Sequence, residues 1–201
     1  MRDNPYSFIT LQRLVGAADR LTEKKWTGMG RLDWLPAIQD VQDRLASPNF
    51  TPYPLKGFNA KKDGKERFLI QLHPADHLLQ LVLLQILSGE LEKIWSDSVH
   101  GYRKGKSTYT AASAIVKALS VGRFHIFKSD VADFFPSINL TILSDMLLYH
   151  VGQDAATLTI SLVKAPVRDE NGIIESSKGL PLGQAGLSLL VSQTISLCLC
   201  L

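Results

Sequence analysis

The chain has few cysteines and no long uninterrupted apolar run. Its two cysteines, Cys198 and Cys200, lie two positions apart and have no partner elsewhere in the 201 residues. This excludes a disulfide-stapled scaffold and is typical of a reducing compartment. The N-terminal residues lack the apolar centre of a signal peptide. The longest apolar stretches are interrupted by Gln85 and by polar residues 192–194, so they are shorter than the roughly 18 residues of a membrane-spanning helix. We therefore expect a cytoplasmic protein without a membrane segment.

Acidic residues are missing from parts of the chain. Overall, 22 Lys and Arg face 19 Asp and Glu, a net charge of +3, and no Asp or Glu follows Glu175. Residues 98–129 hold six basic residues and no acidic one, and residues 56–67 hold five basic residues against two acidic ones. Such local basic fields suit phosphate groups. A solvated surface whose acids come from spatial neighbours gives the same pattern, so charge alone does not decide the function.

Apolar residues are plentiful and recur with regular spacing. They make up 45% of the chain, which is enough to build a core and excludes wholesale disorder. The spacing predicts helices over 8–15, 35–45, 76–95, 111–119, 140–149, 155–163 and 185–201. Shorter runs predict strands on both sides of the Asp63–Gly64 turn within 56–71, a strand over 124–131, and a hairpin over 167–174. The pattern therefore predicts an α+β fold.

The strongest local feature is the segment 127–138. An apolar strand is expected to deliver Asp130 at its end, Phe134 and Phe135 follow, and a helix begins near Ser137. A carboxylate at the end of a strand is a suitable ligand for Mg²⁺, which takes one or two protein carboxylates and completes its shell with water and phosphate oxygens. A lone aspartate at a strand end is more often a turn former or a helix cap, so the metal interpretation depends on its context.

Four segments, in order, resemble blocks of a reverse transcriptase of the bacterial retroelement type, found in group II introns, retrons and diversity-generating elements. KKDGKER (61–67) resembles the fingers hairpin, HGYRKGKST (100–108) the second block, DVADFFPSI (130–138) palm motif A, and KGLPLGQ (178–184) motif B. Their order and spacing make the resemblance specific from about Pro54 onward. It implies a right-hand polymerase that is rich in helix and has a small, incomplete antiparallel sheet. The expected parts are an N-terminal helical extension (1–53), fingers (54–127) and a partial palm (128–201).

The resemblance implies an RNA-directed DNA polymerase that uses an RNA template, a DNA primer, dNTP and Mg²⁺. Phosphoryl transfer of this kind uses two metal ions to clamp the attacking and leaving oxygens. Asp130 would be the catalytic metal ligand, and the backbone carbonyl of Val131 would add an oxygen. Asp133 would lie near the triphosphate. Phe135 falls where the family places its sugar gate, which excludes a ribose 2′-OH, whereas for Phe134 we expect plain core packing.

The basic blocks imply contacts with phosphate groups. Arg67 would hold the triphosphate bidentately, with Lys62 or Lys65 as a point charge, although exposed charges are also common on edge hairpins. Gly183 would let the motif B segment approach the nucleotide closely. The residues implied for the template backbone are Arg103, Lys104 and Lys106. Their contacts would make RNA binding salt-dependent.

The sequence departs from the family in two places. Leu182 stands where most members of the family carry Gln. In this respect the chain resembles the diversity-generating enzymes, which place Ile, Leu or Val at this position. A retron-like or unclassified lineage is equally open. The Tyr-x-Asp-Asp block expected after motif B is absent. One bridging aspartate cannot hold two Mg²⁺ ions, so we expect this chain alone to be inactive and to be part of a longer enzyme, with an exposed apolar face where palm strands are missing. A non-catalytic RNA-binding module and an inactive truncated product are the alternatives.

Overall fold

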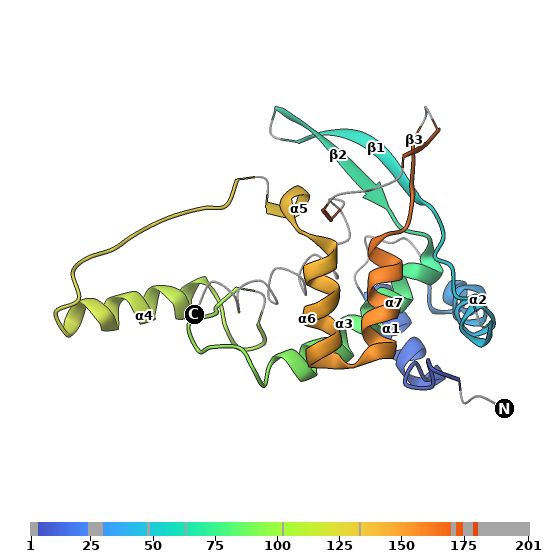
Figure 1. Cartoon of the computed structure of the whole chain (residues 1–201), viewed down its shortest axis with the longest axis horizontal. Coiled ribbons are helices and arrows are strands. Elements are labelled where there is room, and N and C mark those ends of the chain that lie inside the picture. The colour runs from blue at the N-terminus through green and yellow to red at the C-terminus, as the bar shows by residue number, and fades with distance from the viewer. Residues whose placement is uncertain are drawn as a thin grey trace.

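The structure is a computed structural model that describes residues 4–23, 30–47, 49–62, 64–101, 103–132, 134–169, 172–174 and 179–180. A helical body carries a projecting β-hairpin, and a further helix extends to one side (Figure 1). The helices are α1 (Leu11–Glu23), α2 (Leu35–Ala46), α3 (Pro74–Leu91), α4 (Thr108–Ser120), α5 (Phe134–Ser137), α6 (Leu140–Val151) and α7 (Gln153–Val163), with a 3₁₀ helix at Arg31–Trp34. The strands are β1 (Leu55–Lys62), β2 (Lys65–Gln71), β3 (Val167–Asp169) and β4 (Gly172–Ile174). The α+β class predicted from the sequence is confirmed.

Helix α3 is the centre of the helical body, which we define as α1, α2, α3, α6 and α7. It packs against each of the other four helices. Its sequence is apolar nearly all round, as expected for a helix surrounded by others, and it begins at His73–Pro74, where His73 caps the helix. Its side chains with no exposed area are Ala75, Leu78, Leu79, Val82, Leu83, Leu87 and Leu91. None of the helices in the described part of the chain is long and apolar enough to cross a membrane.

The sheet has the strand order β2-β1-β3-β4. Strands β1 and β2 form an antiparallel hairpin that turns at Gly64, whose φ of 77° is a conformation that glycine adopts without strain. Strand β1 then pairs in parallel with β3, and β3 pairs antiparallel with β4. The two hairpins predicted from the sequence are therefore present, but they form one mixed sheet, and the expectation of a purely antiparallel sheet is wrong. The parallel pairing joins Leu55 to Val167, residues too far apart in sequence for a local pattern to predict.

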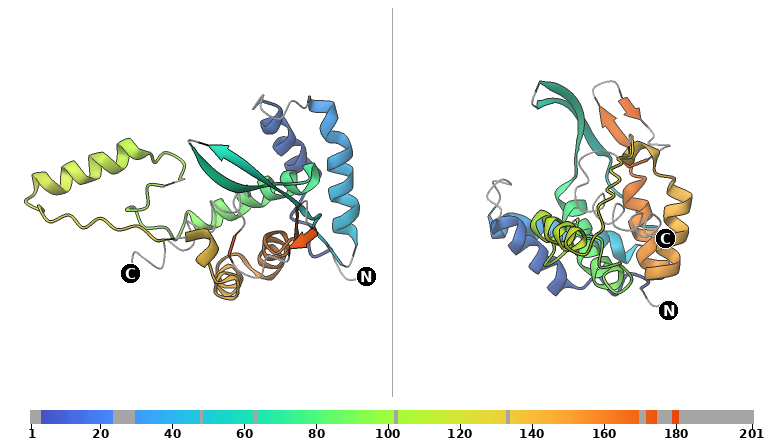
Figure 2. Two further views of the ribbon diagram at one scale, coloured as in Figure 1. Left: turned by 90° about the horizontal axis from the view of Figure 1, so that it is seen from above. Right: turned by 90° about the vertical axis from the view of Figure 1, so that its left-hand side faces the viewer.

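The strand predicted over 124–131 is not formed. Residues 121–131, which we call the arm, follow α4 and run as an extended segment without a pairing strand among the described residues. A strand needs a neighbour for its backbone hydrogen bonds, and an apolar alternation alone supplies none. Figures 1 and 2 show α4 and the arm projecting from the helical body, and α4 buries none of its residues. Phe124 is 72% exposed and Phe127 is 90% exposed, so the arm presents two large apolar side chains to solvent.

Candidate functional site

Asp130 lies on the surface, at the end of the arm and four residues before α5. Its side chain is exposed, and one carboxylate oxygen, Oδ1, accepts a hydrogen bond from the backbone N–H of Val131 at 3.0 Å. This bond orients the carboxylate relative to the backbone of the following residue. Asp133, which the sequence placed near the triphosphate, lies outside the described residues.

Helix α5 anchors this segment to the helical body. Phe134 and Phe135 are half-buried and pack edge to face, with ring centroids 5.3 Å apart and an interplanar angle of 66°. Both rings lie against the main hydrophobic core, and Ile138 is buried in it. Packing of Phe134 therefore agrees with the expectation. Phe135 is placed by the same core contacts.

The segment is also joined to the beginning of the predicted motif B. The backbone N–H of Leu180 donates to the carbonyl oxygen of Phe135 at 2.9 Å, and the Leu180 side chain is buried in the core that holds Phe135. These residues are 45 positions apart in the sequence. Two blocks that the sequence singled out separately thus meet in space. Leu182 and Gly183 lie outside the described residues.

The β1–β2 hairpin rises on the same side of the helical body as α5 (Figures 1 and 2). In its register Lys62 lies opposite Lys65, and Ala60 lies opposite Arg67. Because side chains alternate between the two faces of a strand, these register positions belong to one face of the hairpin. The side chains of Lys62, Lys65 and Arg67 are not among those described. The hairpin that the sequence predicted for phosphate binding thus forms, and the positions of Lys62, Lys65 and Arg67 are on one face, with Lys61 on the other.

The second basic block departs from its predicted role at Arg103. This side chain is buried, with 9% of the residue exposed, and its guanidinium donates to the Glu92 carboxylate at 2.5 Å and 3.1 Å. It also donates to the backbone carbonyls of Ser96 at 2.6 Å and Val99 at 3.3 Å. A guanidinium held in this way closes the loop after α3 and is not presented to a template. The predicted template contact of Arg103 is therefore corrected to a structural role in this geometry.

The other two basic residues of that block are closer to solvent. Lys104 is exposed, and Lys106 is partly exposed, with its ammonium 3.2 Å from the carbonyl oxygen and 3.7 Å from the carboxylate of Asp97. Ser107 caps α4 reciprocally with Thr110, which fixes where the helix begins. Lys104 is thus available for a phosphate backbone, whereas Lys106 would exchange its contact with Asp97 for one with phosphate.

The described side chains offer few ligands for the magnesium that the resemblance implies. Among the described residues no group of three or more His, Cys, Asp or Glu side chains could hold a metal ion. Asp130 offers one exposed carboxylate, and the Val131 carbonyl is its neighbour in sequence. Because Mg²⁺ takes one or two carboxylates and fills its shell with water and phosphate oxygens, this donor set fits one ion shared with a phosphate. It does not suffice for the two ions of a polymerase.

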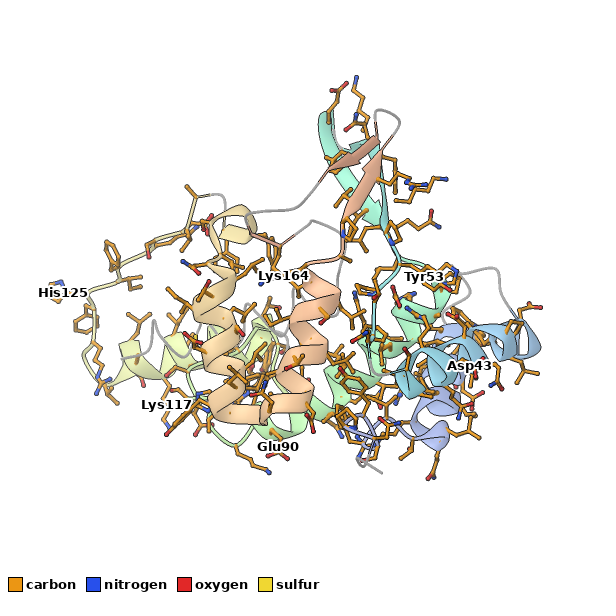
Figure 3. All side chains as sticks on the ribbon, turned by 45° about the vertical axis from the view of Figure 1, so that its right-hand side comes forward. Asp43, Tyr53, Glu90, Lys117, His125 and Lys164 are labelled. Carbon is orange, nitrogen blue, oxygen red and sulfur yellow. The ribbon has the colours of Figure 1, made fainter. Side chains whose placement is uncertain are left out.

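A buried charged network, which no sequence pattern indicated, lies at the root of the β1–β2 hairpin, the end at which β1 begins and β2 ends. Asp76, 1% exposed, accepts from Arg44 at 2.6 Å and from the backbone N–H of Tyr53 at 2.7 Å. Burial raises the pKa of Asp76 above its ordinary value of 3.8, against the opposing effect of Arg44. A hydrogen bond to Asp40 raises the pKa of the Tyr53 hydroxyl. Figure 3 shows Tyr53 at the root of the hairpin. The partners are 23 to 32 residues apart in sequence, so no local pattern indicates them.

Comparison with known proteins gives a fold but no family. No family model and no curated protein matches the chain. Two solved structures that match are described as a partial Cas6-RT-Cas1–Cas2 complex and a Cas6-RT-Cas1–Cas2 complex. Each is 25% identical to this chain over 91% of its residues, with a TM-score of 0.60. The chain spans 32% and 20% of the length of those chains. These complexes contain a reverse transcriptase, and the fold of this chain is reverse-transcriptase-like.

Proposed function

We propose that this chain is the fingers and the first part of the palm of an RNA-directed DNA polymerase of the bacterial retroelement type. In this proposal residues 1–53 are an N-terminal helical extension, 54–127 the fingers and 128–201 a partial palm. The observation that carries it is the hydrogen bond between Leu180 and Phe135, because it joins the segment of Asp130 to the beginning of the predicted motif B. The similarity to a reverse-transcriptase-containing complex supports the same class of nucleotidyltransferase.

In this proposal Asp130 is the catalytic carboxylate. Its exposed side chain would hold Mg²⁺ together with the backbone carbonyl of Val131, and the ion would neutralise charge on the reacting phosphates. Two metal ions need more carboxylates than Asp130 provides, and the sequence has no Tyr-x-Asp-Asp block, so further carboxylates would have to complete the site. We therefore expect no DNA synthesis from this chain by itself.

The incoming nucleotide would be held by the basic face of the hairpin. Arg67 is proposed to bind the triphosphate bidentately, with Lys62 or Lys65 as a compact positive charge beside it. Their shared face in the strand register supports this assignment. Asp133 and Gly183 complete the proposed nucleotide site, one from each of the two joined segments.

Two further contacts concern the sugar and the template. Phe135 is proposed as the sugar gate, since its ring is fixed by the core and by its contact with Phe134. Lys104 and Lys106 are proposed to contact the RNA template backbone, and the DNA primer would lie beside it. Arg103 would support both lysines indirectly by holding their loop.

The test is Mg²⁺-dependent binding of a fluorescent dNTP to the whole chain. We expect Mg²⁺ to tighten binding in the wild type and in the control Asp145→Asn, which removes an exposed carboxylate from α6. Asp130→Asn should abolish this Mg²⁺ effect while RNA binding persists. An unchanged Mg²⁺ effect in Asp130→Asn would refute the assignment.

The alternatives give different results in the same assay. A non-catalytic RNA-binding module would bind RNA in a salt-sensitive way, indifferent to dNTP and Mg²⁺. An inactive truncated product would bind neither ligand. A polypeptide that joins this chain to the missing acidic hairpin should extend a primed RNA template, and Asp130→Asn should abolish that extension.

A further inference from the structure

A cavity of about 470 Å³ opens at the root of the β1–β2 hairpin. Its walls include Tyr53, Lys56, Phe58, His73 and Arg168, so it shares no residue with the segment of Asp130. Sites for small ligands have volumes of roughly 300–1,000 Å³, and this cavity is within that range. The cavity lies between the beginning of β1, the beginning of α3 and strand β3, and the tertiary fold brings these three elements together.

One wall of the cavity is aromatic and held in place. The Tyr53 ring lies against the His73 ring, with centroids 4.0 Å apart, and the guanidinium of Arg44 lies 4.4 Å from the Tyr53 centroid. The Tyr53 hydroxyl donates to Asp40 at 3.0 Å, which restrains the ring further. Phe58 stands nearby on β1 and is 43% exposed. Aromatic side chains that are fixed or exposed in this way can stack on a planar ligand.

The other wall is cationic. Lys56 and Arg168 are both exposed and lie opposite each other in the parallel pairing of β1 with β3. Lys56 and Phe58 are two residues apart on β1, so they share a face of the sheet. None of the described residues that line the cavity is acidic, and none has a side-chain amide. The cavity therefore combines aromatic surface with positive charge, without side-chain amides that could read a base edge.

We propose that this cavity is a second nucleotide site, distinct from the triphosphate site. The base would stack on Phe58 beside the Tyr53–His73 pair, and a phosphate would bind Lys56 and Arg168. The site accepts any base, because stacking depends on a π-face that all bases have. A free nucleotide and a nucleotide within a single strand present the same chemistry. The proposal does not depend on polymerase activity or on Asp130.

The test measures binding of radiolabelled UMP to the whole chain by equilibrium dialysis in EDTA, so that metal-dependent binding is excluded. Phe58→Ala should weaken binding at least about fivefold, the lower range for one base–aromatic stack. The matched control is Phe68→Ala, because Phe68 is similarly exposed, at 40%, but lies on the opposite face of the hairpin. The control should bind UMP as the wild type does.

The phosphate contact has its own pair of variants. Arg168→Gln should weaken UMP binding and remove most of its salt dependence, whereas Lys61→Gln, on the opposite face, should change neither. Uridine, which lacks the phosphate, should bind more weakly than UMP and should not distinguish Arg168→Gln from the wild type. Equal binding of uridine and UMP would overturn the phosphate assignment.

The source of the nucleotide is distinguished with a single-stranded probe. An oligouridylate of about ten nucleotides, within the usual range of single-strand site sizes, is compared with UMP. Tighter binding of the strand, lost in Phe58→Ala, identifies a nucleotide within a strand; equal affinity identifies a free nucleotide. The proposal is overturned if neither probe binds, or if Phe58→Ala and Phe68→Ala bind alike. Asp130→Asn should bind both probes normally, so a failure here leaves the polymerase proposal to its own test.

Discussion

Removal of Arg44 should destabilise the chain strongly, because this side chain joins α2 to α3 and to the loop before β1. Its guanidinium lies 2.6 Å from the carboxylate of Asp76 and 3.2 Å from that of Asp40, and it donates to the carbonyl of Thr51 at 3.1 Å. Asp76 is buried on α3 and also accepts the backbone N–H of Tyr53. Arg44→Ala would leave the Asp76 carboxylate buried without its countercharge.

The expected loss follows from that burial. Removing one partner of a buried ion pair costs about 3–5 kcal/mol in the free energy of unfolding, whereas an exposed pair contributes about 0–1 kcal/mol. The exposed pair Lys93–Glu90 is the matched case in this chain. We therefore expect a loss of about 3–5 kcal/mol for Arg44→Ala and of less than about 1 kcal/mol for Lys93→Ala.

The loss should depend on pH. Burial raises the folded-state pKa of Asp76 above 3.8, and Arg44 opposes that rise. A carboxyl with a raised folded-state pKa contributes stability that is fully present below its unfolded pKa and is lost as pH rises through the folded one. Without Arg44 the folded-state pKa of Asp76 rises further. The penalty of Arg44→Ala should therefore be largest near neutral pH and should shrink as pH falls toward the unfolded pKa.

Urea unfolding followed by tryptophan fluorescence measures both quantities, at about pH 7 and at a pH near the ordinary carboxyl pKa of 3.8, where the penalty should be smaller. The reasoning is refuted if Arg44→Ala loses less than about 1 kcal/mol at neutral pH, since that is the range of an exposed pair. It is also refuted if the penalty grows as pH falls.

Two further predictions concern surfaces that the sequence had singled out. Arg103→Ala should lower the free energy of unfolding by about 1–3 kcal/mol, because Glu92 and two backbone carbonyls lose their donor, and should leave the salt dependence of RNA binding unchanged. Lys104→Gln should instead reduce the slope of log affinity against log salt concentration by about 0.7 with single-stranded RNA. If Arg103→Ala reduces this slope and Lys104→Gln does not, Arg103 and not Lys104 contacts the RNA backbone. Replacing Phe124 and Phe127 by serine should reduce self-association, measured by light scattering, without lowering the melting temperature, because both rings are exposed. A large loss of stability would show that the rings are buried in solution.

Local patterns were sufficient for most of the elements. The apolar spacing over 76–95 predicted α3 (Pro74–Leu91), and the turn at Asp63–Gly64 predicted the β1–β2 hairpin. Both depend on residues close in sequence, whose helical period or turn chemistry is sufficient to specify them. The order of four short blocks also predicted a reverse-transcriptase-like fold, in agreement with the structural similarity. The predicted helix over 185–201 lies outside the described residues.

The sequence by itself thus determined the kind and order of most of the elements and the class of the fold, because these depend on short-range spacing and on the order of motifs. Only the tertiary structure decided which surfaces face solvent and which residues meet. It buried Arg103 against Glu92, left the arm around Phe127 unpaired, and brought Leu180 to Phe135. The physical reason is that burial and strand pairing depend on neighbours distant in the chain, which neither composition nor periodicity records.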